Sequence, residues 1–383
     1  MIRISDKHNC TGCTACMAVC PVQCIVMRRD RQGFDYPVGN ADMCIGCGKC
    51  EAVCPVLNPM DPAEPLATYA VRVPEYMDGS SSGGVFPALA KAVVDEGGAV
   101  YGAVLNPDMT VGHAEADDMD GVEAMRGSKY VQSDMYDAFT DVKALLDDGK
   151  NVLFSGTPCQ VAGLNKFLGK PYENLLTVDV ACHGVPSPGL WERYVAALGH
   201  KYGGRVTGVK FRDKSHSWRS YEFAVETTEG KVSVPRFKDV YMTLFLQDMS
   251  LRPSCYCCPA KDGKSHSDVT LADLWNVSAV AADLDDDRGS SLVLANSSKG
   301  KSVVSAVCEG LAEVDFAEAK KRNAGFTAVV KVPERRDDFF AGMHSAKDIM
   351  KYMSGFVVHK NVLVKFYERV HTVLSKMKRR ICK

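Results

Sequence analysis

The sequence CTGCTACMAVCP, residues 10–21, decides how the first part of the chain folds. Four cysteines stand at the spacing CxxCxxCxxxC, and a proline follows the last of them. Three closely spaced cysteines with a fourth before a proline form the ligand pattern that bacterial ferredoxins use to hold a 4Fe-4S cluster. The stretch therefore predicts an α+β ferredoxin module, and it predicts that electrons pass through this protein.

The same motif recurs as CIGCGKCEAVCP at residues 44–55, which indicates a second cluster. Structural zinc sites are the alternative, but zinc is bound by separated CxxC pairs. In two-cluster ferredoxins the fourth cysteine of each run binds the other cluster. Cys24 lies outside the pattern and is interpreted as a small buried hydrophobe. The predicted ligand sets are Cys10, Cys13, Cys16 and Cys54 for one cluster, and Cys44, Cys47, Cys50 and Cys20 for the other.

Length and composition limit what the rest of the chain does. The 383 residues, 46% hydrophobic and 24% charged, suit two or three globular domains. A net charge of -1 argues against a general attraction to nucleic acid. Sixteen cysteines in a chain that starts MIRISDKHNC, without an apolar signal core, indicate a reducing, cytoplasmic compartment. No apolar run is long enough for a membrane span.

Beyond a proline-rich linker at 57–65, strands alternate with amphipathic helices. This pattern is typical of an α/β domain with a mainly parallel sheet, and the shorter strands beyond Arg205 suggest hairpins and a partly mixed sheet. The expected division is 1–65 for the two-cluster ferredoxin domain, 66–150 and 151–330 for the two parts of the α/β domain, and 331–383 for a helical basic tail.

Cysteines in the α/β domain suggest a third metal centre. Thr157 is placed to cap a helix that starts at Pro158, so Cys159 should feel the helix dipole, which favours its thiolate. Cys182 follows the next strand, at the same edge of the sheet. The pair Cys255 and Cys258 would complete a set of four. From spacing alone, two buried hydrophobes and a redox-active or zinc-binding CxxC pair are equally good explanations.

A family resemblance favours the third cluster. The stretches SGTPCQVAGL (155–164), VACHGVPSPGLW (180–191), RPSCYCCPAKDGKSHSDVTLADLW (252–275) and RGSKYVQSD (126–134) resemble coenzyme F-420 hydrogenase and dehydrogenase beta subunits. That family implies an FAD-binding α/β domain with its own 4Fe-4S cluster, and the matching ligands would be Cys159, Cys182, Cys255 and Cys258. Where the family has Gly-Asp-Phe-Trp-Gly, this chain has Ala272 to Asn276, which leaves the substrate open.

A flavin is expected because a 4Fe-4S cluster passes single electrons, whereas most organic substrates exchange a hydride. Hydroxyls and glycines at a predicted helix N-terminus suit a phosphate, although a surface turn has the same composition. The RGSKY loop suits a pyrophosphate or a reduced flavin, although a solvated basic loop would have the same composition. Lys129 is the predicted catalytic residue. The predicted flavin-binding residues are Ser80, Ser81, Ser82, Gly83, Gly84, Arg126, Gly127, Ser128, Lys129 and Tyr130.

The last residues, 356–383, combine apolar positions at helical spacing with many lysines and arginines. Such a helix suits peripheral contact with an anionic membrane, docking on its own protein, or partner binding.

Together these patterns predict an iron-sulfur flavoprotein oxidoreductase. Its partners would be a ferredoxin or another redox protein and a small hydride donor or acceptor, such as a deazaflavin, a pigment ring or a sugar-derived compound. The alternative is an electron-transfer subunit that serves a separate catalytic chain.

Overall fold

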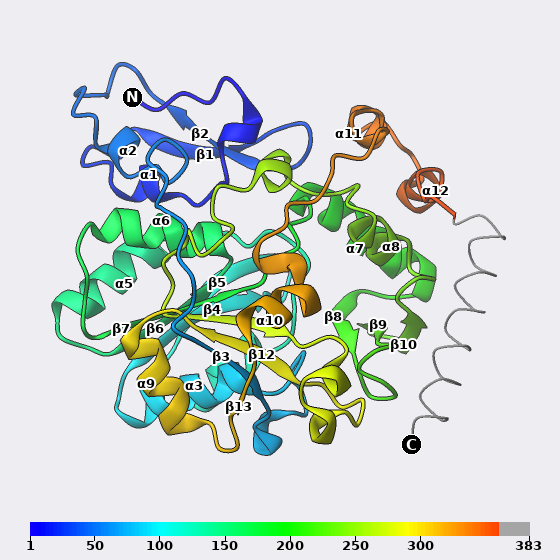
Figure 1. Cartoon of the computed structure of the whole chain (residues 1–383). Coiled ribbons are helices and arrows are strands. Elements are labelled where there is room, and N and C mark those ends of the chain that lie inside the picture. Colours follow the sequence, from blue (N-terminus) through cyan, green and yellow to red (C-terminus); the bar gives the residue numbers. More distant parts are fainter. Residues whose placement is uncertain (360–383) are drawn as a thin grey trace.

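An eight-stranded sheet forms the centre of the large domain (Figure 1). The structure, a computed structural model, describes residues 1–359. The strand order is β13-β3-β12-β11-β7-β6-β4-β5. The strands are β3 (Ala67–Val71), β4 (Ala99–Leu105), β5 (Val111–Ala116), β6 (Val152–Gly156), β7 (Leu175–Val180), β11 (Val269–Asp273), β12 (Ser291–Ala295) and β13 (Ala312–Glu313).

The centre of this sheet is parallel. The pairs β4–β6, β6–β7 and β7–β11 are parallel, whereas β4–β5, β11–β12, β12–β3 and β3–β13 are antiparallel. Two successive antiparallel pairings return β3 to the direction of β11, so β3, β4, β6, β7 and β11 all run the same way. The predicted α/β class with a mainly parallel, partly mixed sheet is confirmed.

Helices cover both faces of the sheet (Figure 1). Successive residues of a strand point to opposite faces, and β6 shows the consequence: Leu153 belongs to one apolar core, whereas Val152 and Phe154 belong to another. On the side of Leu153 lie α3 (Val85–Asp95), α4 (Met119–Met125) and α9 (Ser298–Val307), and on the other side lie α5 (Ala138–Asp147) and α6 (Pro158–Leu168).

The ferredoxin-like part lies against α6 (Figure 1). It contains the antiparallel hairpin β1 (Ile25–Arg29) and β2 (Asp35–Gly39), with the short helices α1 (Ala15–Ala18) and α2 (Lys49–Ala52). The segment that follows is bonded to the large domain: Ala63 N donates to Asp262 O at 3.1 Å, and Leu66 N donates to Ala295 O at 2.8 Å. The predicted linker is therefore held along the surface of the domain.

A second, antiparallel sheet has the order β10-β9-β8 and consists of β8 (Val206–Asp213), β9 (Glu222–Thr227) and β10 (Gly230–Pro235). The hairpin predicted here is therefore present. Its strands form a sheet of their own instead of mixing into the main sheet, which corrects that part of the prediction. The reason is that their inward side chains, including Phe211 and Phe223, pack on the helices of a separate core.

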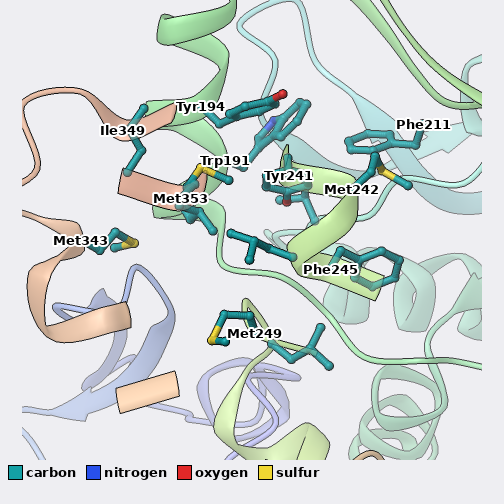
Figure 2. Close-up of a cluster of buried hydrophobic side chains, with 14 of the residues drawn as sticks. Trp191, Tyr194, Phe211, Tyr241, Met242, Phe245, Met249, Met343, Ile349 and Met353 are labelled. Atoms are coloured by element: carbon teal, nitrogen blue, oxygen red, sulfur yellow. The ribbon is translucent and has the colours of Figure 1, made fainter. Parts of the chain in front are cut away.

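That core joins α7 (Pro188–Tyr202), α8 (Val240–Leu246), α11 (Arg336–Met343) and α12 (Ile349–Ser354). Figure 2 shows Trp191 and Tyr194 of α7 near Tyr241 of α8, with Met353 of α12 beside them. One further helix, α10 (Phe316–Arg322), precedes α11.

Within residues 1–359, no helix has the length and apolarity that a membrane crossing requires. The predicted basic helix at the C-terminus falls mainly on residues 360–383, which lie outside the described residues, so its membrane contact stays a prediction.

Candidate iron-sulfur and flavin sites

The first predicted ligand set lies buried beside α1. Cys10, Cys13, Cys16 and Cys54 are all buried, and the thiol of Cys16 interacts electrostatically with the other three. Burial raises the pKa of Cys16, and it raises the pKa of Cys13 to about 11. The structure therefore brings together four cysteines, and burial disfavours the free thiolate of Cys13 and of Cys16. Such a set suits a cationic centre that binds them all as thiolates.

The second set lies nearer the surface. Cys20, Cys44, Cys47 and Cys50 line one pocket, and Cys47 is exposed. Cys24 lines the same pocket, with its Sγ atom 3.4 Å from Cys20 Sγ. The prediction that Cys24 is buried is confirmed. Its position beside a predicted ligand was not visible in the spacing.

The third set gathers where β6 and β7 end. Cys159, Cys182, Cys255 and Cys258 line one pocket, although they come from three separate segments of the chain. Cys159 follows β6 and Cys182 follows β7, and these strands are parallel neighbours, so both residues lie at the same edge of the sheet. The pair from the CxxC motif is brought to this edge by the turn at Pro253–Cys257.

The start of α6 confirms the predicted cap. Thr157 is the N-cap residue, Pro158 occupies the first turn, and Thr157 N donates to Gln160 Oε1 at 2.8 Å. In the chain without metal, burial and the nearby Cys258 thiol raise the pKa of Cys159 well above its usual value. The expected effect of the helix dipole on its thiolate stays a prediction.

Geometry alone does not identify the metal at these cysteines. In the described part of the chain, no three His, Cys, Asp or Glu side chains are close enough together to hold a metal ion. The assignment of the three sets as cluster ligands rests on the sequence spacing, the shared pockets and the common burial of the thiols. It is therefore part of the proposal below.

The two loops predicted to hold a flavin meet each other. The Oγ atoms of Ser81 and Ser128 are 2.8 Å apart, and Ser128 N donates to Ser81 Oγ at 2.8 Å. Arg126 Nη2 donates to Tyr76 O at 3.0 Å and to Ser80 Oγ at 3.3 Å. Residues that are distant in the sequence thus form one layer above the N-terminus of α3.

Part of the predicted phosphate cradle is already engaged within the protein. Ser82 Oγ donates to Ser290 O at 2.8 Å, and Gly83 N donates to Ser291 Oγ at 3.0 Å. A Cβ atom on Gly83 would lie 2.5 Å from Val71 O, so packing against β3 already requires a glycine here. Both positions therefore have structural contacts within the protein, and their contact with a flavin stays a prediction. An anion at this place would depend mainly on cationic side chains.

Two such cations lie close by. Lys129 Nζ donates to Ala124 O and Arg126 O, both at 2.9 Å, and burial lowers the pKa of Lys129 to about 7. Arg212 is buried and pairs with Asp273 at 2.6 Å. Its Nε and Nη2 atoms are also buried, and they find no hydrogen-bond partner among residues 1–359. These unpaired donors near the RGSKY loop fit the negative charge of a flavin diphosphate or of a substrate.

The segment from Ala272 to Asn276, which departs from the family motif, packs beside the Ser81 loop. Trp275 stacks on Trp218 with ring centroids 4.5 Å apart, and Trp218 Nε1 donates to Ser81 O at 3.1 Å. Asn276 has a φ of 56°, in the left-handed region that glycine and asparagine adopt most readily. Asparagine thus stands at a left-handed position that would also suit the expected glycine.

A row of rings connects the third cysteine pocket with the RGSKY loop. His183 lines that pocket, pairs with Asp248 at 2.6 Å, and lies 5.2 Å from the ring of Phe245. Phe245 stacks on Tyr130 at 4.3 Å.

Two buried cations near the cysteines were missed by sequence reasoning. Lys261 Nζ donates to the carbonyl oxygens of Cys182 and Gly325, and Arg252 Nη2 lies 3.6 Å from Cys10 Sγ. Arg252 stands in the quoted RPSCYCC stretch, but nothing in the sequence shows that it reaches the first 35 residues.

Comparison with known proteins agrees with these features. Residues 149–320 match the family described as the C-terminal part of the coenzyme F420 hydrogenase/dehydrogenase beta subunit, and residues 9–58 match the 4Fe-4S dicluster domain. The resemblance inferred from the sequence is confirmed, and the chain is an iron-sulfur redox protein related to the F420 hydrogenase beta subunit.

The comparisons with solved structures and with curated proteins identify no relative of high sequence identity. A chain from the xenon-derivatized F420-reducing NiFe hydrogenase complex of Methanosarcina barkeri aligns at 17% identity and a TM-score of 0.43, covering 77% of this chain and 93% of that one. The comparison with curated proteins gave no match.

Proposed function

We propose that the chain is an iron-sulfur flavoprotein oxidoreductase that passes electrons between two ferredoxin-type clusters, a third cluster and FAD, to or from a hydride-exchanging substrate. The observation that carries this proposal is the pocket at the edge of the parallel strands. Four cysteines from three distant segments meet there, inside the domain that matches an oxidoreductase family. Chance burial of single cysteines would not bring all four to one pocket.

Different residues would bind the clusters and the flavin. Cys159, Cys182, Cys255 and Cys258 would hold the third cluster, and the eight cysteines of residues 9–58 would hold the other two. When bound, the clusters supply one-electron transfer and the flavin converts between single electrons and hydride.

Cationic side chains would position the flavin. The unpaired donors of Arg212 are placed to bind an anionic group, and Ser81 with Ser128 holds the two loops together. Lys129 is poised to hold or release a proton at Nζ near neutral pH, because burial brings its pKa to about 7. Lys129 is therefore the proposed catalytic residue.

The surface beside the second cysteine set suggests where a redox protein would dock. Met43 and Ile45 are 50% and 64% exposed and flank Cys44 in the sequence, and Ile45 lines one pocket with the exposed Cys47. Exposed apolar side chains around a cofactor site suit transient contact with another redox protein. The same surface would serve the alternative function, an electron-transfer subunit for a separate catalytic chain. Turnover of a small substrate by the isolated chain would favour the enzyme, whereas strict dependence on a second chain would favour the subunit.

Stopped-flow absorbance tests the route. Reduced ferredoxin is mixed with the full chain, and cluster and flavin absorbance are followed together in wild type, C258A and C257A. Cys257 is the matched control, because it lies in the same turn but does not line the pocket. We expect flavin reduction to slow by orders of magnitude in C258A only. Flavin reduction in C258A that keeps pace with wild type would contradict the route.

Flavin content tests the other half of the proposal. One FAD per chain should copurify with protein whose clusters are intact, and R212M should retain less of it. R219M is the control, since Arg219 lies at the surface and pairs with Asp285 and Asp287. Cluster-loaded wild type without flavin would overturn this assignment.

A further inference from the structure

A buried arginine without a carboxylate partner lies between the ferredoxin-like part and the α/β domain. Arg252 is 1% exposed. Within residues 1–359 it forms no ion pair with an aspartate or glutamate, unlike the other interior arginines Arg212 and Arg336. A buried guanidinium normally needs an opposite charge, since moving an ion out of water costs several kcal/mol.

The contacts of Arg252 point into the ferredoxin-like part. Nε donates to Cys10 O at 2.8 Å, and Nη2 donates to Asp35 O at 3.0 Å and toward Cys10 Sγ at 3.6 Å. Nη1 donates to Gln132 Oε1 at 3.0 Å, and the guanidinium lies 4.2 Å from the centre of the Tyr36 ring. Of these partners, only the Cys10 sulfur can carry a negative charge, as a thiolate bound to metal.

Arg252 also lies close to the third cysteine set. It stands three residues before Cys255 in the chain, and together with Thr11 it lines the pocket of the third cysteine set. Arg252 thus contacts a sulfur of the first set and borders the pocket of the third. The negative charge that would balance Arg252 is therefore expected between the first cysteine set and the pocket of the third.

We propose that Arg252 is the counter-cation of the cluster held by Cys10, Cys13, Cys16 and Cys54, and that it raises the reduction potential of that cluster. This inference rests on the ligand sets proposed above. Four thiolates give the cluster a net negative charge, and reduction adds one more, so a nearby fixed cation stabilises the reduced form more than the oxidised form. Net charge and hydrogen bonds to the sulfurs are the known determinants of such potentials.

The test is a potentiometric titration of the reconstituted full chain, followed by electron paramagnetic resonance of the reduced clusters. Loss of the charge in R252M should lower one of the one-electron waves by the equivalent of at least a tenfold change in its equilibrium constant, about 59 mV. R252K keeps the charge and should recover most of the shift. The waves of the other clusters should stay where they are.

Arg336 supplies the matched control. It is buried, donates to Leu251 O at 2.7 Å and to Gln32 Oε1 at 3.0 Å, and so also joins the two parts of the chain, but it contacts no cysteine sulfur. R336M should leave every wave unchanged. An equal shift in R336M, or no shift in R252M, would overturn the inference.

A second variant covers the case in which R252M does not fold. Q132E places a carboxylate where Gln132 Oε1 now accepts from Arg252, at almost unchanged volume. The new ion pair would neutralise the cation, so the same wave should fall, and an unmoved wave would contradict the inference. Iron content and the number of one-electron reduction waves report on the ligand sets separately. If the proposed ligand sets are wrong, a reduction wave will be missing. If only this inference is wrong, all waves will be present and none will shift in R252M.

Discussion

Lys129 is the side chain whose acid–base chemistry matters most for the proposed flavin site. Among the described residues, its ammonium group donates to two backbone carbonyl oxygens and pairs with no carboxylate, and burial lowers its pKa from the usual value near 10.5 to about 7. The charged form is disfavoured because it has lost hydration without gaining a paired carboxylate. Above pH 7 the amine is therefore largely neutral, while an ordinary lysine stays charged up to about pH 10.

This property predicts how Lys129 reacts with an amine-selective reagent. The extent of acetylation, measured by peptide mass spectrometry across pH, should rise around pH 7 for Lys129. For Lys91, a surface lysine whose pKa is raised by its hydrogen bond to Asp95, it should rise only at a pH above that of an ordinary lysine. Because the pKa is lowered, the reactive form appears as pH increases through 7. A midpoint for Lys129 near that of Lys91 would contradict the assignment.

Residues whose role depends on local spacing could be predicted from the sequence. The eight ferredoxin-type cysteines follow from two short motifs, and Cys159 with Cys182 follows from where two strands end. Arg252 could not be found in this way, because its partners Cys10, Asp35 and Gln132 are distant in the chain. The packing of Gly83 on Val71 O was not foreseen either, because a glycine required by packing and a glycine that admits a ligand look the same in sequence.

Helix α6 is the element that links two of the cysteine sets. It begins with Cys159 in its first turn, and one turn later a Cβ atom on Gly163 would lie 2.9 Å from both Cβ and Sγ of Cys13. The bare backbone at Gly163 therefore lets the first set approach the helix that carries the third. A larger residue would force α1 and α6 apart.

G163A should destabilise the protein despite the better helix propensity of alanine. That propensity is worth about 1 kcal/mol, whereas overpacking at a tight contact costs about 1–3 kcal/mol. In anaerobic urea titrations followed by cluster absorbance, G163A should have a lower midpoint than wild type. K166A, in the same helix, should not. A midpoint for G163A at or above that of wild type would show that α1 and α6 do not require this close approach.

Elements were predicted better than their pairing. The cap, the first turn and the length of α6 follow from TPCQVAGLNKFLG, because capping is local. The separate sheet of β8, β9 and β10 was not predicted, because the strand pattern shows which residues alternate but not which sheet they join. Strand β5 was likewise missed, and it pairs antiparallel with β4 at the edge of the main sheet.

At the scale of the whole molecule, the ferredoxin-like part is docked rather than tethered. Gly33 and Gly189 approach each other so closely that a Cβ atom on Gly33 would lie 2.7 Å from Gly189 Cα, and Ser187 Oγ donates to Gln32 O at 2.6 Å. The linker is also bound, since Ala63 N donates to Asp262 O. The order of the three cysteine sets in space is therefore fixed by packing.

Cleavage of the linker should leave the two parts associated. A specific protease site inserted after Leu57, which is exposed, would be cut in the reconstituted protein. Each predicted ligand set lies wholly on one side of the cut, so no cluster would hold the fragments together. We expect both fragments to elute together in anaerobic gel filtration. Separate elution would show that the contacts at Arg252, Gly33 and Ser187 are too weak to fix the arrangement.

The central claim is that Cys159, Cys182, Cys255 and Cys258 hold a third cluster in addition to the two in the ferredoxin-like part. Iron and sulfide analysis after anaerobic reconstitution measures this directly. The account predicts about twelve iron atoms per chain in wild type and in C257A, and about eight in C258A, because each 4Fe-4S cluster contributes four. About eight iron atoms in wild type, or equal losses in C257A and C258A, would contradict it.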